Sequence, residues 1–365
     1  MIPFFNYQAL YNKDKKNILK VFDSVCSKGA FILQDELKQF EKNAAKFIKA
    51  KYLIGVANGT DALILGLKAA GIKKGDEIII PSHTYIATAA AIKLVGATPI
   101  LTECKDDSMM DENDIEHRIT KKTKAIMAVQ LNGRCCTMDK IIKIANKYKI
   151  LMFEDAAQGF GAKFKNKYAG NFGLFGTISF YPAKLIGCFG DGGAVVTNNK
   201  AFAKKILLLR DHGRNNNGKV IDWGFNSRLD NIQAAILNHK LIKYRLDIEK
   251  RREIASIYQK YLKNIDKIKL PPEPGKKDNF DVYQNYEIQC EKRDLLIKYL
   301  KKNNIRCLVQ WGGYAVHQIR ELNFKTKLPK TDLFFKKCLM LPMNTTLSKK
   351  DIMTIITKIK SFYDK

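Results

Sequence analysis

Short runs of apolar and β-branched residues alternate with segments of helical periodicity through the first two-thirds of this 365-residue chain. The runs predict strands at residues 52–57, 77–81, 98–101, 124–130, 150–154, 177–181 and 194–197. Between many of them the apolar pattern predicts helices, at residues 61–70, 84–94, 138–148 and 200–210. Such alternation favours an α/β fold in which helices cover both faces of a mostly parallel, mixed sheet.

A long helix rich in Leu, Ile, Lys and Arg is predicted from about residue 228 to 262, and the organisation changes there. The Pro-Pro-Glu-Pro-Gly segment at 271–275 is the clearest break in the chain. Beyond it the pattern predicts a strand at 282–289, a helix at 292–303, a strand at 305–309 and two further helices. We expect a large domain over residues 1–240 and a smaller α+β domain over 241–365. Residues 1–30 are expected to pack on the large domain or on a partner subunit.

The chain is strongly basic, with 64 Lys and Arg against 36 Asp and Glu and a formal net charge of +28. A nucleic-acid partner is one interpretation of such a charge, and a solvated cationic surface is the other. The lysines are spread along the whole chain and form no basic arm or helix-turn-helix module. We therefore expect no nucleic-acid partner, although a basic surface would attract an anionic ligand such as a nucleotide diphosphate.

Eight cysteines and five histidines occur, in no CxxC, HxxxH or HxH spacing. This pattern predicts reduced thiols and no metal site. The apolar stretches are far shorter than the ~20 residues of a membrane span. The N-terminus has no basic segment before an apolar one, so no signal peptide is predicted. We expect a cytoplasmic protein with no membrane segment.

Three segments carry residues suited to chemistry, and each also has an ordinary structural interpretation. Gly59 and Thr60 join a strand to a helix, where they could hold a phosphate or simply form a turn with a Thr N-cap. Asp155 ends an apolar strand, where it could face a cationic ligand or cap a helix. Lys184 lies between a strand and the Gly-rich turn at 190–193, where a desolvated amine could form a Schiff base, whereas most lysines are solvated.

Together these segments resemble the DegT/DnrJ/StrS sugar aminotransferases, a family of fold-type-I pyridoxal-phosphate enzymes. The matching motifs are Gly-Val-Ala-Asn-Gly-Thr-Asp-Ala-Leu at 55–63, Gly-Asp-Glu at 75–77, Pro-Ser-His-Thr-Tyr-Ile-Ala-Thr at 81–88, Glu-Asp-Ala-Ala-Gln at 154–158, Ser-Phe-Tyr-Pro-Ala-Lys at 179–184, Gly-Asp-Gly-Gly-Ala at 190–194, Arg-Asp-His-Gly at 210–213, Asn-Ser-Arg-Leu at 226–229 and Leu-Pro-Met at 341–343. Any one of them is weak, but their order and spacing over nearly the whole chain make the resemblance specific.

The resemblance implies the cofactor, pyridoxal 5′-phosphate, and a role for each matching residue. Lys184 would bind the cofactor covalently and later move the proton, and Asp155 would pair with the pyridine nitrogen. The further implied cofactor contacts are Gln158 on the ring hydroxyl, Tyr85 on the ring face, Gly59, Thr60 and Ser179 on the phosphate, and Asn226 on the phosphate of a neighbouring subunit. A homodimer with shared active sites is therefore implied.

The resemblance also implies a reaction, the transfer of an amino group from L-glutamate to a nucleotide-linked keto-deoxysugar. The motif at 55–63 is closer to the branch acting at the third ring carbon, with a thymidine diphosphate carrier. A 4-keto sugar remains an alternative, as do a sugar dehydratase and a non-catalytic regulator. A dehydratase would typically replace Lys184 with His, and a regulator would need a DNA-reading module.

Two segments depart from the family pattern near the expected sugar site. Residues 130–134 read Gln-Leu-Asn-Gly-Arg where many members have His-Leu-Tyr-Gly, and residues 185–189 depart from the commoner Asn-Leu-Gly. The candidate substrate contacts are Arg134, Arg228, Trp311 and His317. Each could equally be structural, and Trp311 could be a packed indole in a turn.

Overall fold

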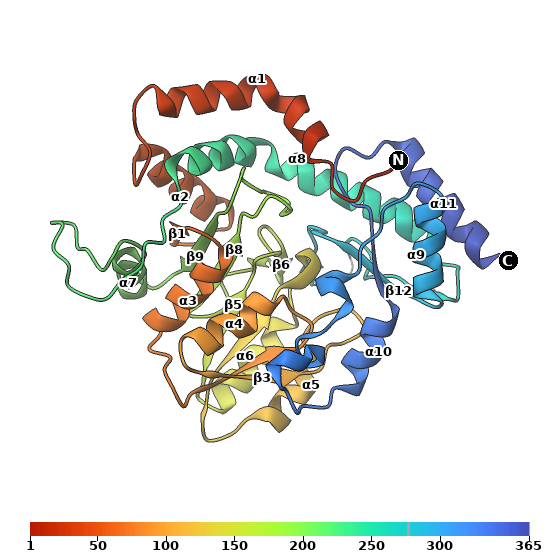
Figure 1. Ribbon diagram of the computed structural model, residues 1–365. Coiled ribbons are helices and arrows are strands. Elements are labelled where there is room, and N and C mark those ends of the chain that lie inside the picture. The colour runs from red at the N-terminus through yellow and green to blue at the C-terminus, as the bar shows by residue number, and fades with distance from the viewer. Residues whose placement is uncertain (276–277, 365) are drawn as a thin grey trace.

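The computed structural model describes residues 1–275 and 278–364. Its centre is a seven-stranded sheet in the order β1-β9-β8-β5-β4-β2-β3 (Figure 1). The strands are β1 (Tyr52–Val56), β2 (Glu77–Pro81), β3 (Thr98–Thr102), β4 (Thr123–Val129), β5 (Leu151–Asp155), β8 (Phe175–Ser179) and β9 (Gly193–Thr197). Within this sheet β9 alone runs against the other strands. The α/β fold with a mostly parallel, mixed sheet is confirmed, and all seven predicted strands form.

Helices cover both faces of the sheet because its strands are apolar on both sides. In β2, Ile79 packs in one buried cluster, whereas Ile78 and Ile80 pack in the other. The first cluster includes residues of α2 (Asp35–Phe47), α6 (Met138–Lys147) and α8 (Asn231–Leu262). The second includes residues of α3 (Gly59–Ala69), α4 (Ile86–Leu94) and α7 (Lys200–Arg210). Because helices pack on both faces of the sheet, the ends of its strands are held in fixed positions, and the site lies there.

The 32-residue helix α8 joins the two parts of the molecule (Figure 1). Leu237 and Tyr244 pack in the first cluster of the large sheet, whereas Ile254 and Tyr258 pack in a separate C-terminal cluster. That cluster surrounds an antiparallel sheet of β10 (Ile268–Lys269), β12 (Tyr286–Cys290) and β13 (Cys338–Leu341), with α9 (Arg293–Lys302) and α11 (Lys349–Tyr363). The domain boundary between residues 240 and 241 falls inside α8 and stays a prediction, and three residues of the expected second domain (276, 277 and 365) lie outside the described ones.

The remaining elements are short or peripheral. They are α1 (Tyr7–Cys26), α5 (Glu112–Ile115), α10 (Pro329–Lys337) and a small sheet of β6 (Lys163–Phe164), β7 (Lys167–Tyr168) and β11 (Asn279–Phe280). α1 packs along α8, while Asn344 donates to the carbonyl oxygens of Pro3 and Phe4. The N-terminal segment thus contacts the C-terminal part as well as α8. Across residues 1–275 and 278–364, no helix combines the length and apolar character needed to cross a membrane.

Two predictions for the C-terminal part are wrong. The expected strand at 305–309 does not form, because Ile305 and Leu308 make isolated bridges to different partners, Ile2 and Met340. The expected strand at 282–289 begins later, at Tyr286. Tyr283 takes a left-handed conformation with φ 51°, which no regular strand accommodates. Residues 282–285 therefore form a loop, and this loop reaches the site.

Candidate active site

A cavity of about 680 Å³ lies at the carboxyl ends of the parallel strands. Ligands of open α/β sheets bind at this edge, and the volume is typical of a small-molecule site. The large sheet and its helices contribute Asn58, Gly59, Thr60, Thr84, Tyr85, Asp155, Gln158, Ser179 and Lys184 to the lining, and the C-terminal part contributes Gln284, Asn285, Gln310, Trp311 and Met340. The structure thus brings together seven of the predicted cofactor residues, with Trp311 beside them.

Asp155 is the last residue of β5, and its side chain is held by two donors. Thr88 Oγ1 donates to Asp155 Oδ2 at 2.7 Å, and the Ala157 backbone N–H donates to Oδ1 at 3.1 Å. No helix begins between β5 and β6, so the helix-capping interpretation is wrong. Burial raises the pKa of Asp155, against the opposing effect of these hydrogen bonds and of Lys184. A cation in the cavity would stabilise this desolvated carboxylate.

Lys184 follows β8 in the turn that leads to β9 and reaches the same cavity. Desolvation lowers the pKa of its amine to about 8, although the negative charge of Asp155 acts in the other direction. At pH 7 about a tenth of such amines are unprotonated, against roughly 0.04% for an ordinary lysine. Lys184 is therefore a much better nucleophile at neutral pH than a solvated lysine.

The first turn of α3 forms one wall of the cavity and leaves backbone donors free for an anion. The N-cap of this helix is Asn58, which accepts from the Asp61 N–H at 2.8 Å, so the predicted Thr60 N-cap is wrong. A Cβ on Gly59 would lie 3.0 Å from Ser179 Cβ, so glycine allows α3 and the end of β8 to approach closely. A helix N-terminus beside two hydroxyls, those of Thr60 and Ser179, suits a phosphate.

Gln158 and the two aromatic residues complete the lining around Asp155. Gln158 Oε1 accepts from the Asn132 backbone N–H at 2.8 Å. The rings of Tyr85 and Trp311 lie 5.3 Å apart at 43°, and Tyr85 is exposed. The two rings therefore form an aromatic wall from the two parts of the chain.

Four predicted residues do not line this cavity. Arg134 donates to Asp281 at 2.5 Å, and Arg228 donates to Asp211 at 3.1 Å. His317 is held between Ser82 at 2.7 Å and Asp332 at 3.0 Å. Asn226 is exposed and pairs with Asp211 in an isolated bridge. Within one chain these residues are engaged elsewhere, and their roles in a substrate or phosphate contact stay predictions.

Sequence reasoning missed other residues that the structure places in or beside the cavity: Thr88, Asn132, Gln284, Asn285 and Gln310. Thr88 lies in the first turn of α4 and Thr84 lies two residues before that helix, and their hydroxyls are 2.7 Å apart. A pair of threonines four residues apart at the start of the expected helix at 84–94 could have been noticed as a polar pair. Gln284 and Asn285 belong to a segment expected to be a strand and Gln310 follows the other expected strand, and the pattern gave no signal for any of the three amides.

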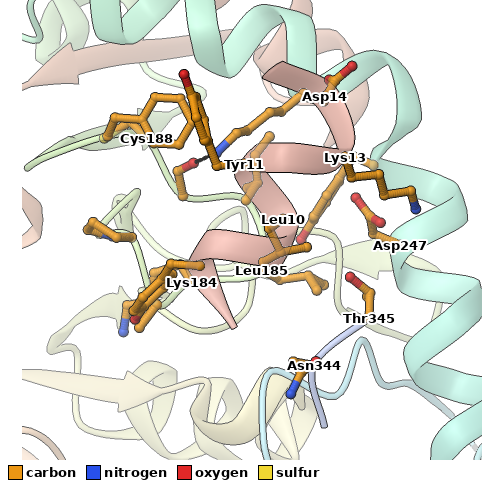
Figure 2. Close-up of a pocket in the computed structure, with 18 of the residues that line it drawn as sticks. Leu10, Tyr11, Lys13, Asp14, Lys184, Leu185, Cys188, Asp247, Asn344 and Thr345 are labelled. Carbon is orange, nitrogen blue, oxygen red and sulfur yellow. Dashed lines mark hydrogen bonds between the residues drawn. The ribbon is translucent and has the colours of Figure 1, made fainter. Parts of the chain in front are cut away.

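A second cavity, of about 290 Å³, borders the segment that carries Lys184 and is also lined by that lysine (Figure 2). It is bordered by α1, α8 and residues 182–189, and Figure 2 shows Leu10 and Tyr11 of α1 facing it. Lys240 of α8 lines this cavity and donates to the Gly187 carbonyl. α8 thereby anchors the segment that follows Lys184.

The fold and the convergence of Lys184 with Asp155 define a fold-type-I aminotransferase. The model of the DegT/DnrJ/EryC1/StrS aminotransferase family matches residues 12–360. The chain therefore belongs to this family of sugar aminotransferases, as its sequence predicted.

Three similar proteins illustrate the likeness. The "Pleiotropic regulatory protein" of Geobacillus stearothermophilus is 35% identical over 99% of this chain and 98% of that protein. The dTDP-3-amino-3,6-dideoxy-alpha-D-galactopyranose transaminase of Aneurinibacillus thermoaerophilus is 36% identical over 99% of each chain. The crystal structure of S. venezuelae DesV in complex with a ketimine intermediate superposes with a TM-score of 0.95 at 32% identity, covering 100% of this chain and 99% of that one.

Enzymes of this family depend on pyridoxal 5′-phosphate, which is the cofactor that the sequence predicted. The described residues fit it. A lysine with a lowered pKa, a buried carboxylate without a cationic hydrogen-bond partner and a free helix N-terminus lie around one cavity. These three groups match a carbonyl, a protonated ring nitrogen and a phosphate.

Proposed function

We propose that this enzyme transfers the amino group of L-glutamate to a nucleotide-linked keto-deoxysugar, with a dTDP-linked 3-keto-6-deoxyhexose as its first candidate substrate. The observation that carries the proposal is the placement of Lys184 and Asp155 on one cavity, which a second wall of aromatic and amide groups closes. The similarity over nearly full length to a dTDP-3-amino sugar transaminase supports the choice of sugar.

Each residue has a proposed task. Lys184 would bind the cofactor and, once released from it, carry the proton between the two reacting carbons. Asp155 would keep the cofactor's ring nitrogen protonated, and Thr88 with the Ala157 N–H would orient the carboxylate. When bound, the cofactor supplies an electron sink that no side chain provides. A fixed carboxylate in a desolvated site is an effective counter-charge because it needs no reorganisation during the reaction.

The remaining residues would position the two substrates. Gly59, Thr60 and Ser179 would hold the cofactor phosphate at the N-terminus of α3. Gln158 would donate to the ring hydroxyl. Tyr85 would lie against the ring, and Trp311 would extend the aromatic wall toward the sugar.

We further propose a homodimer in which Asn226 of one copy reaches the phosphate site of the other. The segment 211–226 projects from the body of the molecule, after α7 (Figure 1). It carries Trp223, which is 90% exposed, and the exposed Val220 and Ile221. An apolar group exposed to this degree suits burial against a second copy.

Two alternatives have less support. A sugar dehydratase that lacks the Schiff-base lysine does not match a chain in which Lys184 is present and its pKa is lowered. A purely regulatory function is the other alternative, and one relative carries the name "Pleiotropic regulatory protein". It would not require Lys184 and Asp155 to be held together.

The experiment is a product assay. The purified enzyme would be incubated with L-glutamate and a panel of 3-keto and 4-keto sugars linked to dTDP, UDP or GDP, with products identified by mass spectrometry and NMR. We expect 2-oxoglutarate and one amino sugar. A dehydrated sugar or no turnover with any member of the panel would contradict the proposal.

A further inference from the structure

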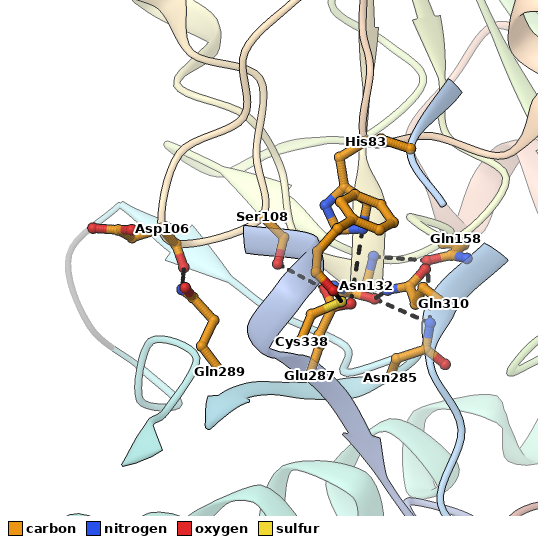
Figure 3. A network of polar contacts seen from close by, with 12 residues as sticks. His83, Asp106, Ser108, Asn132, Gln158, Asn285, Glu287, Gln289, Gln310 and Cys338 are labelled. Carbon is orange, nitrogen blue, oxygen red and sulfur yellow. Dashed lines mark hydrogen bonds and ion pairs between the residues drawn. The ribbon is translucent and has the colours of Figure 1, made fainter. Parts of the chain in front are cut away.

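A network of polar groups lies under the cavity, and the proposed transamination assigns it no task (Figure 3). Its centre is Glu287, whose side chain is 1% exposed on β12. Glu287 Oε2 accepts two hydrogen bonds, from Ser108 Oγ and from Asn132 Nδ2, both at 2.8 Å. Ser108 and Asn132 belong to the large-sheet part, so the carboxylate connects the two parts of the molecule.

The other oxygen of Glu287 faces a buried histidine. Oε1 lies 3.7 Å from His83 Nε2, but burial lowers the pKa of His83 to about 3, so the ring is neutral and forms no ion pair. No Lys or Arg pairs with Glu287 among residues 1–275 and 278–364. Burying a carboxyl without a cationic partner is costly. An apolar residue at this position would give a more stable fold. The presence of a carboxyl therefore indicates a role for its two hydrogen bonds.

Asn132 connects this carboxyl to the cavity. Its Nδ2 donates to Glu287, and its Oδ1 accepts from Asn285 at 3.0 Å and from Gln310 at 2.5 Å. The Asn132 backbone N–H, held in a left-handed conformation with φ 55°, donates to Gln158 Oε1 at 2.8 Å. These contacts leave one orientation for each amide.

The consequence appears at Gln158. Since its Oε1 accepts from Asn132 and, more weakly, from Asn285 at 3.4 Å, its Nε2 group remains to donate into the cavity. Burial raises the pKa of Glu287 to about 7, so Glu287 is ionised above that pH. If the Asn132 amide then rotated, its carbonyl oxygen would face the Glu287 carboxylate and be repelled by it. The carboxylate therefore selects the orientation of the whole group.

We propose that Glu287 is a positioning residue of the transamination site: it orients the Asn132 side chain, whose Oδ1 fixes the Asn285 amide that donates to Gln158 Oε1, so that the Gln158 donor is aimed at the cofactor's ring hydroxyl. The inference rests on the proposed role of Gln158. It assigns a task to the stretch at 130–134, whose sequence departs from the commoner family pattern.

Two substitutions of Glu287 test the proposal. Glu287→Leu removes the acceptor, so the Asn132 amide loses the hydrogen bond that orients it. Glu287→Gln keeps it, because one amide oxygen can accept from Ser108 and Asn132 while the new NH₂ faces the neutral His83 ring. Dissociation constants for pyridoxal 5′-phosphate and absorbance spectra of the bound cofactor would be measured for the purified full-length proteins.

We expect Glu287→Leu to weaken cofactor binding by about 5- to 30-fold, the size of one or two lost hydrogen bonds, and to shift the absorbance band. Glu287→Gln should stay within about twofold of the wild type. An unchanged band and affinity in Glu287→Leu would overturn the proposal. So would a Gln variant as impaired as the Leu variant, because charge rather than orientation would then matter.

Glu103 provides the matched control. It is also a buried carboxylate, it accepts from Thr331 and the Lys330 N–H, and it does not line the cavity. Glu103→Leu should lower the unfolding temperature without moving the band. If the absorbance band shifted as far in Glu103→Leu as in Glu287→Leu, general destabilisation would explain both shifts, and the proposal would be overturned.

A further variant covers the case in which Glu287→Leu does not fold. Asn132→Gly removes the same amide while glycine retains the left-handed backbone, and it should reproduce the spectral shift. A wild-type spectrum in Asn132→Gly would overturn the inference. Failure of the proposed function is distinct, because the wild-type protein would then bind no pyridoxal 5′-phosphate or produce no amino sugar.

Discussion

The two walls of the cavity are built in different ways. The wall from the large sheet places Asp155, Ser179 and Gly59 at ends of regular elements, the last residues of β5 and β8 and the first of α3. The wall from the C-terminal part consists mainly of loop residues such as Asn285 and Trp311, beside Met340 of β13, and the Trp311 backbone is left-handed. Regular elements fix positions through local hydrogen bonds, whereas loops depend on side-chain contacts with the opposite wall. We therefore expect substitutions in the first wall to impair the chemical step, and substitutions in the second wall to impair the fit between the two walls and the substrate.

The largest effect on the first wall is expected from Lys184→Ala. The variant should lose covalent attachment and turnover completely, because no other amine lines this cavity in the described part of the chain. Absorbance of the bound cofactor and trapping with borohydride would measure it. Lys240→Ala is the matched control, since desolvation also lowers the pKa of Lys240 while its amine lines the other cavity. Covalent cofactor in Lys184→Ala would contradict the assignment.

Two neighbouring carboxylates on β5 allow a catalytic role to be compared with a structural one. Asp155→Asn should lower kcat by about 10²–10³-fold, on the order of 3 to 4 kcal/mol, because a preorganised charge is lost. Glu154 instead accepts from Gln130 and the Gly170 N–H in the core. Glu154→Gln should cost about 1–3 kcal/mol of unfolding free energy, since a buried donor loses its acceptor. Steady-state kinetics and urea unfolding of both variants would reveal a reversed pattern if the assignment were wrong.

The pH dependence of cofactor capture tests the environment of Lys184. Its pKa of about 8 lies below the ordinary value, so the reactive neutral amine is lost as the pH falls below 8. The capture rate of the cofactor-free enzyme should therefore fall about tenfold per pH unit below that point and level off above it. Stopped-flow absorbance between pH 6 and 9.5 would measure the profile. A rate still rising steeply at pH 9.5 would show a solvated lysine.

Fit at the second wall is tested by Gly133→Ala. Gly133 has φ 83°, and a Cβ there would lie 2.6 Å from the Gln284 backbone nitrogen. The variant must strain or displace the loop at 282–285, at a cost of roughly 1–3 kcal/mol. Gly71→Ala is the matched control, because its φ is 78° but nothing lies within 4 Å of the new Cβ. We expect a raised KM for the sugar in Gly133→Ala alone, and equal kinetics in the two variants would contradict the contact.

The sequence predicted the first wall far better than the second. The strands at 77–81 and 150–154 are apolar runs with clear ends, so the position of Asp155 at a strand end followed from pattern alone. The loop at 282–285 is harder to predict, because Val282 and Tyr283 favour a strand like β12 itself, although the polar Gln284 and Asn285 lie between them and β12. Only tertiary contacts there, such as the Val282 N–H donating to the Gly133 carbonyl, replace the strand with a loop.

The candidate residues show the same limit. Asp155 and Lys184 share a cavity as expected, but Arg134 forms an ion pair with Asp281, a partner 147 residues away in the sequence. A sequence pattern identifies charged residues near a site without showing which charges already have partners. Glu287 is the converse case, because a single Glu within an apolar strand gave no sign of the network around it.

The last comparison uses Asn226→Ala, which tests whether part of the phosphate site is missing from the single chain. Asn226 is exposed and lies outside the cavity, so any contact with a phosphate requires a second copy. Loss of one hydrogen bond to an anion costs about 1.5–3 kcal/mol, or roughly 10- to 150-fold in cofactor affinity. Equilibrium dialysis would measure the affinity.

Trp223→Ser separates the interface from the hydrogen bond. It leaves Asn226 in place but removes the most exposed aromatic side chain of the projecting segment. If two copies share the site, Trp223→Ser should dissociate the dimer in light scattering and weaken cofactor binding only at protein concentrations where monomers appear. Asn226→Ala should weaken binding at every concentration while the dimer persists. An active wild-type monomer would contradict both expectations, because the first wall would then hold the phosphate alone.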